Sequence, residues 1–279
     1  MSDTRPIGVF DSGMGGLTVL RSLRAHLPHE NLVYLGDTAR LPYGTKSPET
    51  VTAYALQATQ LLMAYDVKMV VIACNTASSV ALVPLARDLA PLPVVGVVEP
   101  GARAGIAATT SGRIGVLATE STVAGGAYPR AIAALSPDTD VQQQACALFV
   151  ALAEEGWGDS SIAEATAARY LAPLFDNEAT APDTLVLGCT HFPVLAPAIT
   201  KVLDARGARA TLVDSAETTA QAVVELLEMQ KLKNTDDRTG TERFLATDAP
   251  ERFARVGELF FGRSITADQV ELVDLRPSI

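Results

Sequence analysis

The sequence predicts an α/β fold of two doubly wound, pseudo-symmetric domains with parallel-rich sheets and a functional site in the cleft between them. Two observations support this prediction. Short apolar runs alternate with turns and amphipathic helical stretches along the 279 residues, which is the rhythm of βαβ units. The runs are unbroken in Val, Ile and Leu, which indicates parallel strands covered by helices on both faces.

Each expected strand is an apolar run of strand length. From the amino end, the runs lie at residues 7–10, 32–35, 69–73, 94–98, 114–117, 185–187 and 212–213. They are far shorter than the roughly 18 or more apolar residues of a membrane-spanning helix. Toward the carboxyl end, the polar residues 233–241 predict a surface loop, and a short strand is expected after it near residues 244–246.

Two pairs of segments repeat in the same order. Residues 7–12 (IGVFDS) resemble residues 114–119 (IGVLAT), and residues 70–76 (VVIACNT) resemble residues 185–191 (LVLGCTH), at offsets of 107 and 115 residues. Such repeats predict a duplicated α/β unit with a cleft where the strand ends of the two copies meet. The expected domains are residues 1–97 plus 209–279, and residues 98–208.

Composition and charge exclude several classes of protein. The chain carries 32 acidic and 22 basic residues, a formal charge of −10 and a pI near 4.8, so binding to nucleic acid or to an anionic membrane is not expected. Three cysteines without a Cys-x-x-Cys pair argue against a disulfide framework and a structural zinc site. No basic segment followed by an apolar one opens the chain, so we expect no secretory signal and a cytoplasmic protein.

Two of the cysteines are the strongest candidates for chemistry. Cys74 and Cys189 each follow an apolar strand and precede a polar helix start. A helix N-terminus lowers a thiol pKa from about 8.5 and also binds carboxylates. One such cysteine is most simply a buried structural residue, but two at matching places predict a functional pair. The third, Cys146, lies outside the repeated segments.

A pair of opposed thiols suits the inversion of a stereocentre. One thiolate removes a proton from one face of a carbon, and the other thiol delivers a proton to the opposite face. The alternative is a cysteine hydrolase or amidase that uses Cys189 and His191. Against it, the two-residue offset is expected to aim these side chains apart, and Cys74 would have no role. His191 either caps a helix or, the favoured interpretation, assists proton transfer.

Two glycine-containing loops supply further candidates. Asp11 and Ser12 precede residues 13–16, a Gly-rich helix start without the third glycine of a dinucleotide-binding fingerprint. Its backbone N–H groups are expected to approach a small anion, with the Asp11 carboxylate on an ammonium group or in a proton relay, although helix capping is a simpler alternative. Residues 36–47 form either a surface turn or a loop that covers the substrate, with Asp37 behind it.

These motifs together resemble the glutamate racemase family, within the wider aspartate/glutamate racemase superfamily. The resemblance spans nearly the whole chain and rests on FDSGxGG at residues 10–16, GDT with PYG at 36–44, CNTAS at 74–78 and GCTHFP at 188–193. It implies cofactor-independent 1,1-proton transfer at the α-carbon of L- and D-glutamate, which supplies D-glutamate for peptidoglycan. It also implies possible assembly as a homodimer.

The same resemblance assigns roles to individual residues. Cys74 is expected to take the α-proton from D-glutamate and Cys189 from L-glutamate. The substrate is expected to contact Asp11, Ser12, Pro42, Tyr43, Gly44, Asn75, Thr76, Thr119, Thr190 and His191. Asp37, Glu154 and His191 are expected to tune the thiols or receive charge. The chain departs from the family at Ala147 and Ala151, where the family has proline.

No cofactor or metal is expected. Pyridoxal phosphate would need a lysine in a pocket, and the five lysines lie away from the motifs, with Lys46 the one arguable exception. Two further alternatives stay open: a racemase of aspartate or another acidic amino acid, and a catalytically inactive relative that acts by binding a protein partner.

Overall fold

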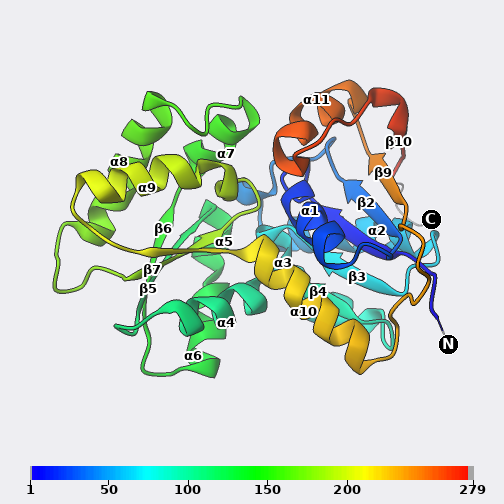
Figure 1. Cartoon of the computed structure of the whole chain (residues 1–279), viewed down its shortest axis with the longest axis horizontal. Helices are drawn as coiled ribbons and strands as arrows, with labels where there is room; N and C mark the ends of the chain where they lie inside the picture. Colours follow the sequence, from blue (N-terminus) through cyan, green and yellow to red (C-terminus); the bar gives the residue numbers. More distant parts are fainter. Residues whose placement is uncertain (1, 276–279) are drawn as a thin grey trace.

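The computed structural model describes residues 2–275 and contains two parallel β-sheets, each packed between helices (Figure 1). The larger sheet has six strands in the order β10-β9-β2-β1-β3-β4, and the smaller has four in the order β6-β5-β7-β8. All strand pairs in both sheets are parallel. The predicted α/β fold with parallel sheets in two domains is confirmed.

The larger sheet carries helices on both faces because its strands are buried on both sides. Side chains of β1 alternate between two cores, with Ile7 and Val9 in one and Phe10 in the other. One core includes helices α1, α10 and α11, and the other includes α2 and α3. The strands are β1 (Ile7–Asp11), β2 (Leu32–Gly36), β3 (Met69–Ile72), β4 (Val94–Gly96), β9 (Glu242–Ala246) and β10 (Val270–Leu272). The helices are α1 (Leu17–His26), α2 (Pro48–Met63), α3 (Asn75–Asp88), α10 (Ser215–Met229) and α11 (Pro250–Phe261).

The smaller sheet is built in the same way. Helices α4 and α6 pack with Val116 and Val186 on one face, and α8 and α9 pack with Leu185 and Leu187 on the other. Its strands are β5 (Arg113–Ala118), β6 (Asp140–Ala145), β7 (Thr184–Gly188) and β8 (Thr211–Asp214). Its helices are α4 (Val98–Ala108), α5 (Glu120–Gly125), α6 (Ala127–Leu135), α7 (Ala147–Glu154), α8 (Ser161–Phe175) and α9 (Ala196–Ala205). Short 3₁₀ turns are η1 (Tyr43–Thr45), η2 (Phe192–Leu195) and η3 (Ala267–Gln269).

The two sheets repeat one strand order. In the order β2-β1-β3-β4 and in the order β6-β5-β7-β8, the first strand of each unit lies between the second and the third. The repeated sequence segments therefore occupy the same places, since β1 and β5 are the first strands and β3 and β7 the third. This arrangement agrees with the expected duplication, and it brings the segments that follow β1, β3, β5 and β7 to corresponding sheet edges.

The sequence missed two strands, β6 and β10, and both lie at sheet edges. Strand β6 reads DVQQQA and has no fully buried residue, so no apolar run marks it, whereas the edge strands β4 and β8 do carry short apolar runs. The strand expected at residues 94–98 ends at Gly96, since Val98 begins α4. Among residues 2–275, no helix combines the length and apolar character needed to cross a bilayer.

Strand β8 bears on the domain boundary. It begins after residue 208, where the second domain was expected to end, and yet it pairs with β7 of the smaller sheet. We propose that the second domain extends through β8 and that the chain returns to the first domain at α10, which packs against both α1 and α4.

Candidate active site

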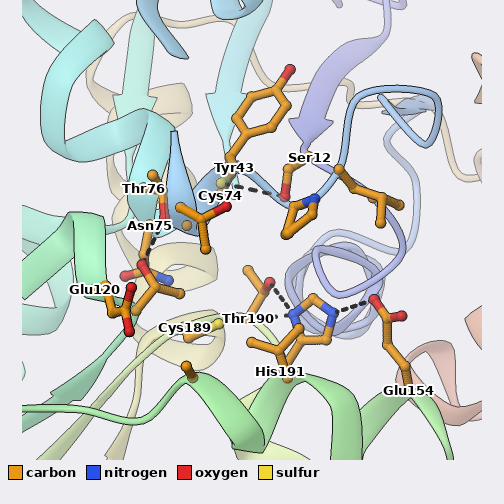
Figure 2. A pocket seen from close by; sticks show the side chains of 18 of the residues that line it. Ser12, Tyr43, Cys74, Asn75, Thr76, Glu120, Glu154, Cys189, Thr190 and His191 are labelled. Carbon is orange, nitrogen blue, oxygen red and sulfur yellow. Dashed lines mark hydrogen bonds and ion pairs between the residues drawn. The ribbon is translucent and has the colours of Figure 1, made fainter. Parts of the chain in front are cut away.

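A cavity of about 280 Å³ lies where β1, β3, β5 and β7 end, between the two sheets (Figure 2). It is smaller than the roughly 300–1,000 Å³ of sites for drug-sized ligands and so suits a small molecule. The predicted site residues that line it are Ser12, Pro42, Tyr43, Gly44, Cys74, Asn75, Thr76, Thr119, Glu154, Cys189, Thr190 and His191. The structure therefore brings together all but two of the side chains predicted from the sequence.

Asp11, one of those two, lies behind the wall of the cavity and is completely buried. Its Oδ2 accepts a hydrogen bond from Gly13 N at 3.0 Å, and its Oδ1 has no partner among the described residues. Burial raises the pKa of Asp11, although the nearby His191 opposes the shift. The expectation that the glycine loop frees its N–H groups for an anion was wrong for Gly13, whose N–H is taken by Asp11.

Asp37 is the second predicted residue that does not line the cavity, and it holds the hydroxyl of Tyr43, which does. Its Oδ2 accepts from the Tyr43 hydroxyl and from Arg40 Nε at 2.7 Å, while its Oδ1 accepts from Thr247 Oγ1 at 3.0 Å. Burial and the Asp37 charge raise the pKa of Tyr43, so its phenol stays protonated and donates. Pro42, Tyr43 and Gly44 line the cavity, so this part of the segment 36–47 is a cavity wall rather than a plain surface turn.

Cys74 is the N-cap of α3. Its Sγ accepts from Ala77 N at 3.5 Å and lies 3.6 Å from Ser12 Oγ. Burial and the Asp11 charge raise the pKa of Cys74 to about 12, and the hydrogen bond from Ala77 offsets only part of this. The expectation of a lowered thiol pKa was wrong here, because removal from water outweighs the helix N-terminus. A thiol with so high a pKa keeps its proton at neutral pH.

Cys189 belongs to a chain of polar contacts. Its Sγ lies 3.8 Å from His191 Nδ1, His191 Nε2 lies 3.1 Å from Glu154 Oε1, and Arg252 Nη2 donates to Glu154 Oε2 at 2.8 Å. Burial lowers the pKa of His191, but the contacts with Cys189 and Glu154 outweigh it and raise the pKa to about 10. The two cysteines therefore have unlike surroundings: Cys189 lies beside the His191 imidazole, whereas Cys74 lies beside a hydroxyl and a backbone N–H.

The convergence of Cys189 and His191 corrects one expectation from the sequence. A two-residue offset after a strand was expected to aim these side chains apart. The chain instead turns sharply after β7, as the bond from Phe192 N to Cys189 O at 3.1 Å shows, before η2 begins. Figure 2 shows the imidazole of His191 between Cys189 and Glu154.

Helix α11, which no sequence motif marks, contacts this chain of residues. Arg252 binds Glu154, and the ring of Phe260 meets the His191 ring edge to face at 5.0 Å. Glu154 lies on α7, next to the smaller sheet, whereas α11 packs on the larger one. No local signal in the sequence could have found Arg252, since 98 residues separate it from Glu154.

Helix α7 contributes lining residues that the sequence analysis did not select. Ala147, Val150 and Ala151 line the cavity together with Glu154. Val150, Ala151 and Glu154 follow Ala147 by three, four and seven residues, so all four lie on one face of the helix. This spacing is visible in the sequence and could have predicted that they line the site together. Three further lining residues, Gly13, Leu41 and Thr45, belong to the two predicted glycine-containing loops, whereas Glu120 was missed.

Gly15 allows His191 to lie where it does. A Cβ at this position would stand 2.4 Å from His191 Nδ1 and 2.5 Å from Thr190 Oγ1. We therefore expect Gly15→Ala to displace the imidazole and to lower the kcat/KM of the chain's reaction by about 10²-fold. Gly125→Ala is the matched control, because a Cβ there meets no atom within 4 Å. Equal activity of the two variants in a steady-state assay would contradict this account.

The chain is similar in sequence to known racemases. It matches the family model of Asp/Glu/Hydantoin racemases over residues 17–223. It is 49% identical over 258 residues to a glutamate racemase of Geobacter metallireducens, with 92% of this chain and 93% of that protein covered. It is 48% identical to a glutamate racemase of Syntrophus aciditrophicus, with 98% of each covered.

Solved structures give the same result. A glutamate racemase from Francisella tularensis in complex with D-glutamate superposes with a TM-score of 0.89 at 37% identity, and one from Bacillus anthracis with a TM-score of 0.90 at 34% identity, each covering 98% of both chains. An allantoin racemase from Klebsiella pneumoniae, at 20% identity and a TM-score of 0.52 over 82% of this chain and 90% of its own, shares the fold. The chain therefore belongs to the Asp/Glu/Hydantoin racemase family and is an amino-acid racemase.

Proposed function

We propose that this chain interconverts L- and D-glutamate by proton transfer between the substrate α-carbon and two cysteines. The observation that carries the proposal is that Cys74 and Cys189, which follow the corresponding strands β3 and β7, line one cavity. The substrate is taken from the relatives, which are glutamate racemases at 48–49% identity, and from the similar structure in complex with D-glutamate.

The two sulfurs exchange roles in each turnover. In the L to D direction, the Cys189 thiolate takes the α-proton of L-glutamate, so the C–H bond breaks and an S–H bond forms. The Cys74 thiol then gives its proton to the opposite face of the carbanion, which leaves Cys74 as the thiolate. The D to L direction is the reverse. His191 suits this scheme because its raised pKa keeps a positive charge beside Cys189 while that sulfur is ionised.

Neutral donors would hold the substrate carboxylates. The described lining residues include hydroxyls of Ser12, Thr76 and Thr119 and the amide of Asn75, but no Lys or Arg. Cys74 and Thr119, which line the cavity, are the N-caps of α3 and α5. The N-terminus of helix α3 therefore also faces the cavity, and helix N-termini bind carboxylates. Donors on the carboxylate stabilise the negative charge that develops at the α-carbon.

The proposal is tested with the purified, reduced protein in D₂O. L-glutamate and D-glutamate are incubated separately, and optical rotation and α-deuterium content are followed together. We expect both enantiomers to lose rotation while deuterium enters the α-position. Failure of both enantiomers to take up deuterium in folded protein would overturn the proposal and direct the assay to aspartate. Amide hydrolysis that needs Cys189 but survives Cys74→Ser would instead indicate the hydrolase that the Cys189–His191 contact makes conceivable.

The pH dependence of activity tests the role of His191. The pKa of His191, raised to about 10, predicts that kcat/KM falls above about pH 10 as the imidazole loses its proton. Glu154→Gln removes a negative charge that raises this pKa, so the alkaline fall should move to lower pH by about one pH unit. Arg252→Gln removes a positive charge instead and should not move it downward. An equal shift of the alkaline fall in kcat/KM to lower pH in both variants would show that Glu154→Gln acts only by disturbing the structure.

We further propose that the D-glutamate formed is used for peptidoglycan synthesis in the cytoplasm and that the enzyme acts as a homodimer. These proposals rest on the family resemblance. A bacterial host deleted for the gene should need external D-glutamate for growth, and light scattering should give twice the chain mass of 29.3 kDa. Growth without D-glutamate, or a monomer at working concentration, would contradict the respective proposal.

A further inference from the structure

We propose that Tyr128 is a positioning residue for Asn75: it holds the amide oxygen of Asn75 so that the amide NH₂ group faces the cavity and donates to a substrate carboxylate. This inference rests on the proposed function, because it requires a substrate with a carboxylate. It concerns a side chain outside the cavity wall, since Tyr128 does not line the cavity and acts only through Asn75.

The contact between the two side chains is direct. The Tyr128 hydroxyl donates to Asn75 Oδ1 at 2.7 Å. Asn75 Nδ2, the other end of the amide, is buried and has no hydrogen-bond partner among the described residues. Asn75 is only 3% exposed and lines the cavity. A buried donor without a partner is costly, so this NH₂ group is set to be satisfied by a ligand.

Tyr128 can hold only the oxygen end of the amide. It is completely buried, and burial together with nearby negative charges raises its pKa, so the phenol keeps its proton. Asn75 Oδ1 is the acceptor that the structure provides for that proton. If the amide were rotated by 180°, the phenol proton would lose this acceptor and the amide oxygen would face the carboxylate, which is repulsive.

The position of Tyr128 is itself closely defined. It lies on α6, in the core that includes Val116 and Val186 of the smaller sheet, whereas Asn75 is the first residue of α3, beside the larger sheet. A Cβ at Gly188 would stand 3.0 Å from Tyr128 Cε2, so the ring fits closely against the residue that precedes Cys189. The hydrogen bond therefore crosses between the two domains and orients the amide only when they are together.

The test is a set of steady-state and calorimetric measurements on the whole chain. Tyr128→Phe removes only the hydroxyl, and we expect the KM for L- and D-glutamate and the calorimetric Kd for D-glutamate to rise about tenfold, with kcat changed less than about twofold. Tyr65→Phe is the matched control, since it removes a hydroxyl that bonds Glu271, at the edge of the larger sheet. It should leave KM, Kd and kcat unchanged.

A double-mutant cycle separates positioning from a merely structural role. In an Asn75→Ala background the Tyr128→Phe change should have no further effect on KM, because the group it orients is gone. A full tenfold rise in that background, or an unchanged KM in Tyr128→Phe alone, would overturn the inference while leaving the proposed function intact. If the wild-type chain neither bound nor racemised glutamate, both the inference about Tyr128 and the proposed function would be overturned.

A second variant covers the case in which Tyr128→Phe fails to fold. Asn75→Asp keeps an oxygen for Tyr128 but places a negative acceptor where the NH₂ group is proposed. We expect its Kd for D-glutamate to exceed that of Asn75→Ala, because it adds repulsion to the lost hydrogen bond. Equal or tighter binding by Asn75→Asp would show that this end of the side chain does not donate to a carboxylate.

Discussion

Cys189→Ser and Cys74→Ser are each expected to lower kcat/KM for racemisation by about 10²–10⁴-fold, the range in which a positioned acid or base contributes. A serine hydroxyl is a far weaker acid than a thiol, so each variant loses one of the two groups proposed to transfer the α-proton. Both directions must fall by the same factor, since the enantiomers are equally stable. Polarimetry with each enantiomer measures the loss.

The two variants should nevertheless differ in exchange with solvent. Cys189→Ser keeps only the Cys74 thiol, which is expected to act on D-glutamate. It should therefore exchange the α-proton of D-glutamate for deuterium from D₂O faster than that of L-glutamate, without inversion. Cys74→Ser should show the opposite preference. Near neutral pH, exchange into L-glutamate by Cys74→Ser should be faster than exchange into D-glutamate by Cys189→Ser. Burial and Asp11 raise the pKa of Cys74 to about 12, whereas Cys189 lies beside the protonated His191.

Cys146→Ser is the control for these variants. Cys146 is also buried but does not line the cavity; its Sγ lies 3.5 Å from Gln144 O. It should retain racemisation within a few-fold. Full activity in either Cys74→Ser or Cys189→Ser would exclude the scheme in which each sulfur serves one face.

Lys68→Met is expected to destabilise the fold by about 3–5 kcal/mol, the usual effect of removing one partner from a buried ion pair. Lys68 Nζ lies 2.5 Å from Glu30 Oε2, with side-chain exposures of 0% and 2%. It also donates to the carbonyl oxygens of Asp3 and Leu232. The variant leaves the Glu30 charge buried without a cation. Urea unfolding followed by circular dichroism measures the change in free energy.

Two comparisons make the Lys68 prediction specific. Lys68→Met combined with Glu30→Gln should recover part of the lost stability, because the second change removes the stranded charge while a Gln oxygen can still accept from Asn234 N, as Glu30 does. Lys233→Met breaks the exposed pair with Glu228 and should change stability little. An equal loss from Lys68→Met and Lys233→Met would contradict the account of the buried pair.

The interior of the fold could be predicted from the sequence because it depends on local patterns. Strands β1, β3 and β7 are buried on both faces, so each reads as an unbroken apolar run. Edge strands β6 and β10 have an open side and carry no such run. The positions of Cys74 and Cys189 at strand ends also followed from the sequence, since parallel strands place their carboxyl ends at one edge.

The sequence by itself therefore determined the strands of both interiors, the repeated unit and the two cysteines at the ends of corresponding strands. Only the tertiary structure decided the raised pKa of Cys74, the approach of His191 to Cys189, and the contacts of Arg252 with Glu154 and of Tyr128 with Asn75. The physical reason is that these two sets of features depend on different kinds of neighbour, along the chain or in space. Apolar periodicity and helix starts depend on neighbours along the chain, whereas desolvation, Coulomb interactions and hydrogen bonds depend on distance in space between residues far apart in sequence.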